Sequence, residues 1–284
     1  GGSDIEVPHS MVVDSSGNLV VLASTSSTNF PTTTGAYEEV FQGGAFFSAV
    51  NASLTYTNGS DIAVFRLNDT GTTLMQSTFV GGSGNDGLNI NLVYNYGDDI
   101  RGEVVVNGLD EVYVASSSVS TDFPTTVGSY SQTNFGGQDG VAFKLTSDLS
   151  AMDWGTYVGG SVNEGFYSIR IGELTGDAYL CGGTQSTDLA TTAGVVGAAY
   201  GGGSHDGCVC RLDGTNGSLN QLTYHGTAGY DQAFIIELDE TEQVYTTGQS
   251  LGAWPVINAP YNVTNAKQFI HKMDSDLSVV DYST

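Results

Sequence analysis

Four acidic positions have the spacing of a repeated site. Each follows a glycine-rich segment and precedes a β-prone run; the residues are Asp4 or Glu6, Asp86, Glu164 and Asp231. If they converge, they cannot all stay ionised without a cation, because like charges raise one another's pKa. Ca²⁺ prefers carboxylate oxygens, so the pattern predicts a calcium site. The alternative is that each carboxylate accepts hydrogen bonds from amides of its own turn.

A basic residue also recurs at one position, as Arg66, Lys144, Arg211 and Lys272. These are four of only seven cationic residues in the chain. A ring that binds phosphate or sulfate is conceivable, but the four belong to separate repeats. We expect each side chain to lie along its strand and to pair with acidic residues of nearby turns. The expected partners are Asp69, Asp148, Asp213 and Asp274.

The three cysteines all fall in one part of the chain. Cys181 is expected in one strand, and Cys208 and Cys210 share a face of an antiparallel neighbour. A disulfide from Cys181 to Cys208 or Cys210 is therefore feasible in an oxidising compartment. Burial of three thiols as small apolar side chains is the alternative. His205 is near, but no CxxC or HExxH pairing supports a zinc site.

No catalytic motif is present. The sequence contains no GxSxG, Walker loop, HExxH or SxxK pattern, and its four histidines occupy inequivalent positions. Carboxylate pairs are abundant in so acidic a chain, so their presence is no argument for glycosidase chemistry. We expect no enzymatic activity, and no cofactor other than calcium.

The elements that position these residues recur four times. A pair of β-prone runs around a polar turn occupies residues 61–83, 139–161, 206–228 and 268–284. A second hairpin precedes each pair, at residues 11–23, 103–115, 167–181 and 233–247. Each repeat therefore contains four strands.

The repeats, about 1–80, 81–158, 159–225 and 226–284, predict one all-β domain. A four-stranded unit of this length that recurs is typical of a β-propeller, here with four blades of four antiparallel strands. Blades lie between neighbours, so both faces of a strand such as residues 61–65 are apolar. The first strand of a blade lines the channel, and the acidic positions would then meet at its mouth.

An aromatic residue before proline marks the loop after the second strand. The motif is STNFPTTTGAY with Phe30 and Pro31, STDFPTTVGSY with Phe123 and Pro124, and a weaker copy with Trp254 and Pro255. We expect the aromatic ring to plug the crevice between repeats and proline to hold the bend. Stacking on a ligand is the alternative.

Composition excludes several classes of function. The chain of 284 residues has 31 acidic and 7 basic residues, a formal charge of −24, so it would repel nucleic acids and anionic membranes. The acidity serves solubility or suits calcium-rich or saline surroundings. No apolar run is long enough to span a membrane. The 39 glycines suit tight turns, and almost no helix is expected. Because residue 1 is not Met, we expect a mature or excised segment.

The order GGSGND, STDFPTT, GGxDGxAFKL and Y/F-V-G-G resembles the SBBP family, the so-called seven-bladed β-propeller repeats of secreted and cell-surface proteins. The likeness covers nearly all 284 residues, although the fourth repeat lacks its GGxD and the third its Phe-Pro. It implies a propeller at the cell surface, in adhesive or structural proteins.

We therefore expect a secreted structural or adhesive module, a subunit of an extracellular assembly. Its partner would be another copy in a homo-oligomer, a neighbouring surface protein or a surface glycan. The alternative is a carbohydrate-binding or carbohydrate-cleaving propeller that acts at the face carrying Asp86, Glu164, Phe30 and Phe123.

The two ends of the chain match the internal repeat boundaries. Internal repeats read STFVGG and GTYVGG, whereas the chain begins with Gly1-Gly2 and ends with Ser283-Thr284. We expect the four repeats to close into a ring that brings Thr284 within a few peptide lengths of Gly1. An open arc of a larger propeller, with its end faces exposed, is the alternative.

Overall fold

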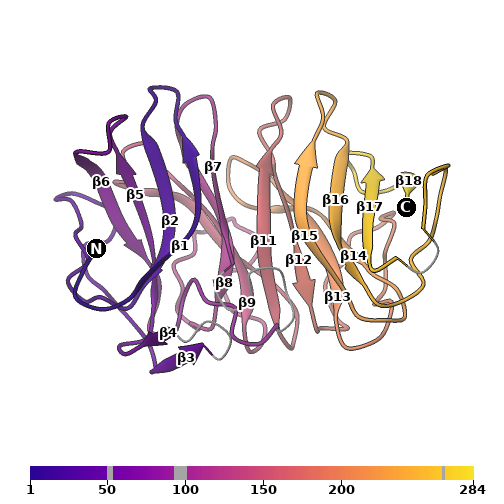
Figure 1. Cartoon of the computed structure of the whole chain (residues 1–284), viewed down its shortest axis with the longest axis horizontal. Coiled ribbons are helices and arrows are strands. Elements are labelled where there is room, and N and C mark those ends of the chain that lie inside the picture. The colour runs from indigo at the N-terminus through magenta and orange to yellow at the C-terminus, as the bar shows by residue number, and fades with distance from the viewer. Residues whose placement is uncertain (50–53, 93–100, 264–265) are drawn as a thin grey trace.

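The protein consists of four antiparallel sheets of four strands each (Figure 1). The computed structural model describes residues 1–49, 54–92, 101–263 and 266–284. No helix occurs in these ranges, so none of them could cross a membrane as a helix. The predicted all-β fold, with four blades of four antiparallel strands, is confirmed.

Each sheet lies within one repeat of the sequence. The first contains β1 (Glu6–Val13), β2 (Leu19–Thr25), β5 (Asp61–Leu67) and β6 (Leu74–Val80), and the second β7 (Glu103–Val106), β8 (Val112–Ser118), β9 (Asp139–Leu145) and β10 (Met152–Val158). The third contains β11 (Glu164–Ile171), β12 (Ala178–Thr184), β13 (Asp206–Leu212) and β14 (Leu219–His225). The fourth contains β15 (Asp231–Leu238), β16 (Val244–Ser250), β17 (Gln268–Met273) and β18 (Val280–Ser283). A small hairpin, β3 (Phe47–Ala49) and β4 (Leu54–Tyr56), lies in the loop between β2 and β5.

The turn between the third and fourth strands of every blade contains one residue in the left-handed conformation. The residues are Gly71 (φ 68°), Leu149 (φ 57°), Gly217 (φ 72°) and Leu277 (φ 55°). A leucine in this region costs about 1–2 kcal/mol relative to the right-handed conformation. Leu149 and Leu277 are fully buried, and their burial offsets that cost.

The core consists of one apolar layer at each of the three junctions between sheets. The layer between the first two sheets joins Val20, Leu22 and Ile62 to Val114 and Phe143, and similar clusters fill the other two junctions. Every residue of β8, β9 and β12 is buried, because both faces of these strands have a neighbouring sheet. In β16 buried and half-buried residues alternate. One face of the fourth sheet is therefore open.

The four sheets form an open arc, and the predicted closed ring is wrong. They follow one another along the longest axis, with the N- and C-termini at opposite ends (Figure 1). Strand β1 contacts β7, β7 contacts β11, and β11 contacts β15, but within the described ranges no extensive contact joins the first sheet to the fourth. Strand β15 also lies against β12 and β13, so neighbouring sheets are nearly face to face. The rotation per blade is consequently too small for four blades to complete a circle.

The predicted disulfide is also wrong, and strand register is the reason. Cys181 is directly opposite Val209, so Cys208 and Cys210 point to the other face of the sheet. The Cys181 side chain lies in the apolar layer between the third and fourth blades, whereas Cys208 and Cys210 lie in the layer between the second and third. All three thiols are free and buried.

Thiol titration tests this arrangement. We expect three reactive thiols per chain in the unfolded, unreduced protein, and very slow reaction in the folded protein, because burial raises the pKa of all three cysteines. A sample reduced before unfolding is the control and should give the same value. If only one thiol were titrated in the unreduced protein, the predicted disulfide would be supported after all.

Candidate functional site

The recurring carboxylates lie at or just before the start of each blade, and for Asp86, Glu164 and Asp231 this is where the chain crosses from one blade to the next. Glu6, Asp86, Glu164 and Asp231 each accept a hydrogen bond from the backbone N–H four residues earlier, at 2.9, 2.8, 2.7 and 2.6 Å respectively. Each also accepts one from a hydroxyl; the donors are Ser27, Ser120, Thr184 and Thr227. The carboxylates thus cap their own turns, which is the alternative that we set beside a calcium site.

Asp4 does not take part in this pattern. Its side chain accepts hydrogen bonds from the backbone N–H of Ile5 and the amide of Asn58. Of the two candidates for the recurring acidic position in the first repeat, Glu6 and not Asp4 is therefore the counterpart of Asp86.

A second carboxylate, which we did not predict, faces the cap at three junctions. Asp61, Asp139 and Asp206 are the first residues of β5, β9 and β13, and each caps the loop before its strand. The connecting glycine passes between the two acids: a Cβ on Gly81 would lie 2.8 Å from Asp61 Oδ1 and 2.9 Å from Asp86 Oδ2. Glycine is therefore needed here because a side chain would collide with the carboxylates, and not because the backbone adopts a left-handed conformation. The sequence signal was visible, because an acid begins the third strand in repeats one to three.

The pKa of four of these carboxyls is clearly raised. Burial raises the pKa of Asp86 and Asp206 to about 7 and that of Asp61 and Asp139 to about 6. A nearby carboxylate adds a smaller contribution: the facing one for Asp86, Asp139 and Asp206, and Glu38 for Asp61. The pKa of Glu164 is also raised by burial. Asp139 Oδ1, Asp206 Oδ1 and Asp231 Oδ1 are buried without a hydrogen-bond partner. Asp61, Asp86, Asp139 and Asp206 therefore take up protons as the pH falls from neutral.

The predicted meeting of the four carboxylates at one channel mouth is wrong, since they belong to separate junctions of an open arc. Within the described ranges, no three His, Cys, Asp or Glu side chains form a group that could hold a metal ion. Calcium binding to Asp4, Glu6, Asp86, Glu164 or Asp231 stays a prediction.

The recurring basic side chains do pair with carboxylates, but not with those we expected. Arg66 pairs with Asp14, Lys144 with Glu111 and Asp153, Arg211 with Asp177 and Asp276, and Lys272 with Asp239 and Asp281. The predicted partners Asp69, Asp148, Asp213 and Asp274 instead lie in the turn that leaves the same strand, and Asp148, Asp213 and Asp274 accept hydrogen bonds within it. Lys144, Arg211 and Lys272 also lie over the rings of Tyr113, Tyr179 and Tyr245. In the first three blades this basic side chain lies on the face that packs against the following blade.

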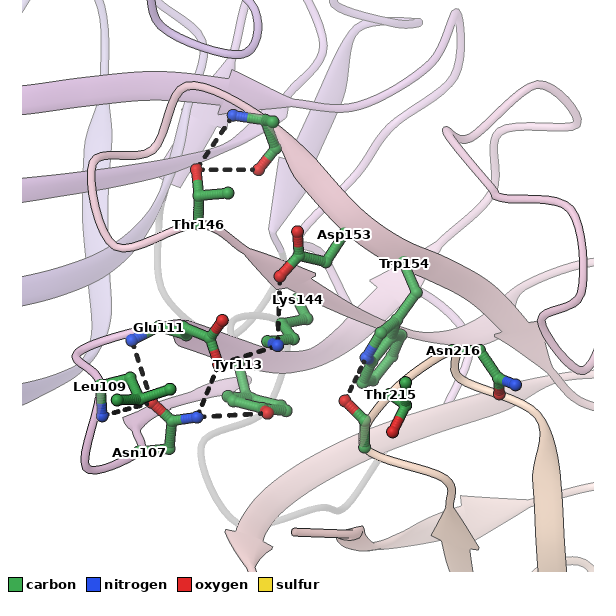
Figure 2. Close-up of polar contacts among 12 residues, drawn as sticks. Asn107, Leu109, Glu111, Tyr113, Lys144, Thr146, Asp153, Trp154, Thr215 and Asn216 are labelled. Atoms are coloured by element: carbon green, nitrogen blue, oxygen red, sulfur yellow. Dashed lines mark hydrogen bonds and ion pairs between the residues drawn. The ribbon is translucent and has the colours of Figure 1, made fainter.

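A pair of hydrogen bonds joins each blade to the third turn of the next one; we call it the turn clasp. The carbonyl of the left-handed residue accepts a backbone N–H from the preceding blade, at the end of the loop that follows its second strand: Tyr37 to Leu149, Tyr130 to Gly217 and Val196 to Leu277, at 2.8–2.9 Å. A carbonyl earlier in the same turn accepts a side-chain donor: Arg66 to Ser147, Trp154 to Gly214 and Arg211 to Ser275. Figure 2 shows Trp154 against this turn, next to Thr215 and Asn216.

Of the aromatic residues before proline, Phe30 and Phe123 are buried and Trp254 is half-buried. Phe30 is 8% exposed and Phe123 3%, and Phe123 lies in the layer between the first two blades. Trp254 stacks on Phe269 with ring centroids 3.7 Å apart, while Pro31 and Pro255 are exposed and Pro124 is half-buried. Asp86 and Glu164 are buried as well as Phe30 and Phe123, so none of these four side chains is exposed. Carbohydrate binding or cleavage at the face that carries them, the alternative given above, stays a prediction.

A groove lined by apolar residues and an arginine lies along the first strands of the blades. A cavity of about 610 Å³ is lined by Val12, by residues 105–108 and by Arg170 and its neighbours. The Arg170 guanidinium is held by Glu103 at 2.9 Å and by both oxygens of Glu237 at 2.6 and 2.9 Å. Arg101 donates to the carbonyl of Phe234. Sequence reasoning missed these arginines because each occurs in one repeat alone.

The four histidines have lowered pKa values, and two of them lie together. His225 and His271 come together between the third and fourth blades, with ring centroids 4.5 Å apart. Burial lowers the pKa of His9 and His271 to about 4 and also lowers that of His225 and His205. His205, His225 and His271 are buried, whereas His9 is half-buried and lines a cavity of about 270 Å³ with Arg101 and Tyr167.

Glycine substitutions test the crossing between blades. We expect Gly81→Ala to lower the free energy of unfolding by more than about 2 kcal/mol, because the methyl group would push apart Asp61 and Asp86. Gly108→Ala is the matched control, since a Cβ there meets nothing within 4 Å, and should leave stability within about 1 kcal/mol. If chemical denaturation showed the same loss of stability for both variants, the crowding of Gly81 by the two carboxylates would be contradicted.

Stability should fall as pH rises. The pKa of Asp86 is raised above its unfolded value, so the folded state binds more protons between about pH 4 and pH 7 and loses that stabilisation as pH rises through this window. We expect a higher melting temperature at pH 5 than at pH 8, and a smaller difference in Asp86→Asn. Asp148→Asn is the control, because hydrogen bonds lower the pKa of this exposed carboxylate and it stays ionised throughout. An unchanged pH dependence in Asp86→Asn would contradict the assignment.

Comparison with known proteins bears on the fold. No family model and no curated sequence matches the chain, so the resemblance to SBBP repeats has no family match behind it. A protein of unknown function from Dyadobacter fermentans is 11% identical, with a TM-score of 0.47, over 97% of this chain and 63% of that one. A mutant of the NanB sialidase from Streptococcus pneumoniae is 8% identical, with a TM-score of 0.50, over 99% of this chain and 52% of that one. The chain thus spans between half and two thirds of the length of these proteins. At such low identity the likeness to the sialidase shows the fold alone, a β-propeller arrangement of antiparallel sheets.

Proposed function

We propose that the protein is an extracellular interaction module, a structural or adhesive subunit of a surface assembly. The proposal rests on the location of the exposed apolar side chains, most of which lie in the first and fourth blades. Of seventeen large apolar side chains that are exposed in the described ranges, twelve belong to the two end blades. Those of the fourth are Ile235, Leu251, Val256, Tyr261, Val263, Ile270 and Val279. Exposed apolar surface gathered at particular faces is typical of binding to other macromolecules.

The state of the charged groups supports a role without catalysis. The buried acids are used as caps, and the Arg170 guanidinium is neutralised by Glu103 and Glu237. A substrate that bound Arg170 would have to displace a bidentate carboxylate, which is among the stronger polar contacts in proteins. The groove is therefore a weak candidate for glycan binding or cleavage.

The charge of the chain suits a location outside the cell. At −24 the surface is strongly acidic, and exposed acids such as Asp276 and Asp281 border the fourth blade. Like-charged molecules repel at low ionic strength, and salt or divalent cations relieve that repulsion. Association through the end faces is then compatible with saline surroundings.

Binding and turnover assays test the proposal. We expect fluorescently labelled protein to be retained saturably on cells of the source organism, with unlabelled protein as competitor. Fluorogenic glycosides, a sialoside among them, should not be hydrolysed. Hydrolysis that Arg170→Ala abolishes and Val127→Glu leaves intact would contradict the proposal, as would the absence of both cell binding and self-association.

A further inference from the structure

The fourth blade carries the donor half of a turn clasp that has no turn to receive it. In the first three blades the clasp donors Tyr37, Tyr130 and Val196 each lie seven residues after a buried apolar residue of the same loop. These buried residues are Phe30, Phe123 and Leu189. The same spacing from Trp254 leads to Tyr261. The Tyr261 side chain is 82% exposed, the most of any aromatic residue among the exposed apolar ones in the described ranges.

The outer face of the fourth blade also repeats the packing surface of the second. In the second blade Tyr113 and Trp154 pack edge to face with centroids 6.0 Å apart, beside Lys144, and both rings are buried against the third blade (Figure 2). The register places Tyr245, Tyr282 and Lys272 at the corresponding positions. Tyr245 and Tyr282 make the same edge-to-face pair at 6.4 Å, but both are only half-buried.

The first blade carries the other half of the contact. In the second blade Val112, Phe143 and Leu145 face the preceding sheet and are fully buried. Their counterparts in the first blade are Leu19, Phe65 and Leu67, which pair in the same register and are only half-buried. A partly exposed apolar row thus lies on the outer side of the first sheet, beside the cluster that Phe30 forms with Ala63 and Phe79.

The receiving turn is present and open as well. Residues 68–73 form the third turn of the first blade, and the Gly71 backbone is left-handed, like that of Leu149 and Leu277. Leu149, Gly217 and Leu277 are buried under the preceding blade, whereas Gly71 is exposed. The Asp69 and Gly71 carbonyls stand at the positions of Ser147 and Leu149.

We propose that a second copy of this chain docks head to tail, with its first blade on the outer face of the fourth. Tyr261 then donates its backbone N–H to Gly71 of the second copy, while Tyr282 and Lys272 lie against the turn at residues 68–73. This rests on the proposed role as an assembly subunit and names the partner. A second copy fits because the two open faces are the two halves of a contact that the chain already makes three times.

Charge sets the conditions under which docking occurs. Each copy carries −24, so long-range repulsion opposes association at low ionic strength. The contact itself is apolar and hydrogen-bonded, and salt shortens the range of repulsion to about 10 Å at 0.1 M. Docking therefore strengthens as salt concentration rises.

Sedimentation velocity on the 284-residue protein, over a range of protein and NaCl concentrations, tests the proposal. We expect the mean mass to rise above the 29.6 kDa of one chain with increasing protein and salt. Ile270→Glu on the fourth blade and Leu67→Glu on the first should each weaken association more than about tenfold, because either would bury an unpaired charge. Val127→Glu is the matched control: Val127 is 92% exposed on the second blade, and the variant should associate like the parent.

Mixing the two end-face variants separates this arrangement from others. Each variant keeps one intact face, so an equimolar mixture of Ile270→Glu and Leu67→Glu should form heterodimers and stop there. Circular dichroism and melting of each variant establish that it is folded. A parent chain that is monomeric under every condition would overturn the proposal and leave another protein or a further blade as the occupant, while cell binding could still support the interaction module. Self-association without heterodimers in the mixture would also overturn it.

Discussion

A four-stranded sheet with two apolar faces is stable in water only when a neighbour covers each face. Strands β8, β9 and β12 are buried along their whole length because they have such neighbours on both sides. The turn clasp sets how neighbours meet, since the third turns of the second, third and fourth blades each accept two hydrogen bonds from the blade before them. Stacking thus supplies the apolar burial, and the clasp determines its register.

Crossing from one blade to the next creates a second constraint. The glycine-rich crossing exposes backbone N–H groups in a place shielded from water, and buried donors need acceptors. A carboxylate can accept several hydrogen bonds at once: Asp86 accepts the backbone N–H of Gly82 and the hydroxyls of Ser118 and Ser120. Burial raises the pKa of Asp86, and a second acid close by, Asp61, raises it further. The same residues that order the crossing therefore make its stability depend on pH.

The repeated pattern of strands and turns was sufficient to predict four blades of four strands, because each repeat is locally complete and its polar turns mark where strands end. Closure was not predictable, since it depends on the rotation between sheets, which arises from the packing of many side chains. The cysteines show how one residue of register changes the outcome: with Cys181 opposite Val209, the other two thiols face away. The partners of the basic residues were also missed, because pairing occurs across strands and not along the turn.

The clasp gives the array a direction. Every junction joins unlike halves, a face with a basic residue and aromatic or aliphatic side chains on one blade and a turn with a left-handed residue on the next. A face of the first kind has no turn with which to pair with itself, so contacts between copies through these surfaces are heterologous. Since the rotation per junction inside the chain does not close a ring of four, copies that add in the same sense continue the arc. Whether they meet after a full turn or advance as a helix depends on the small rise that accompanies each rotation.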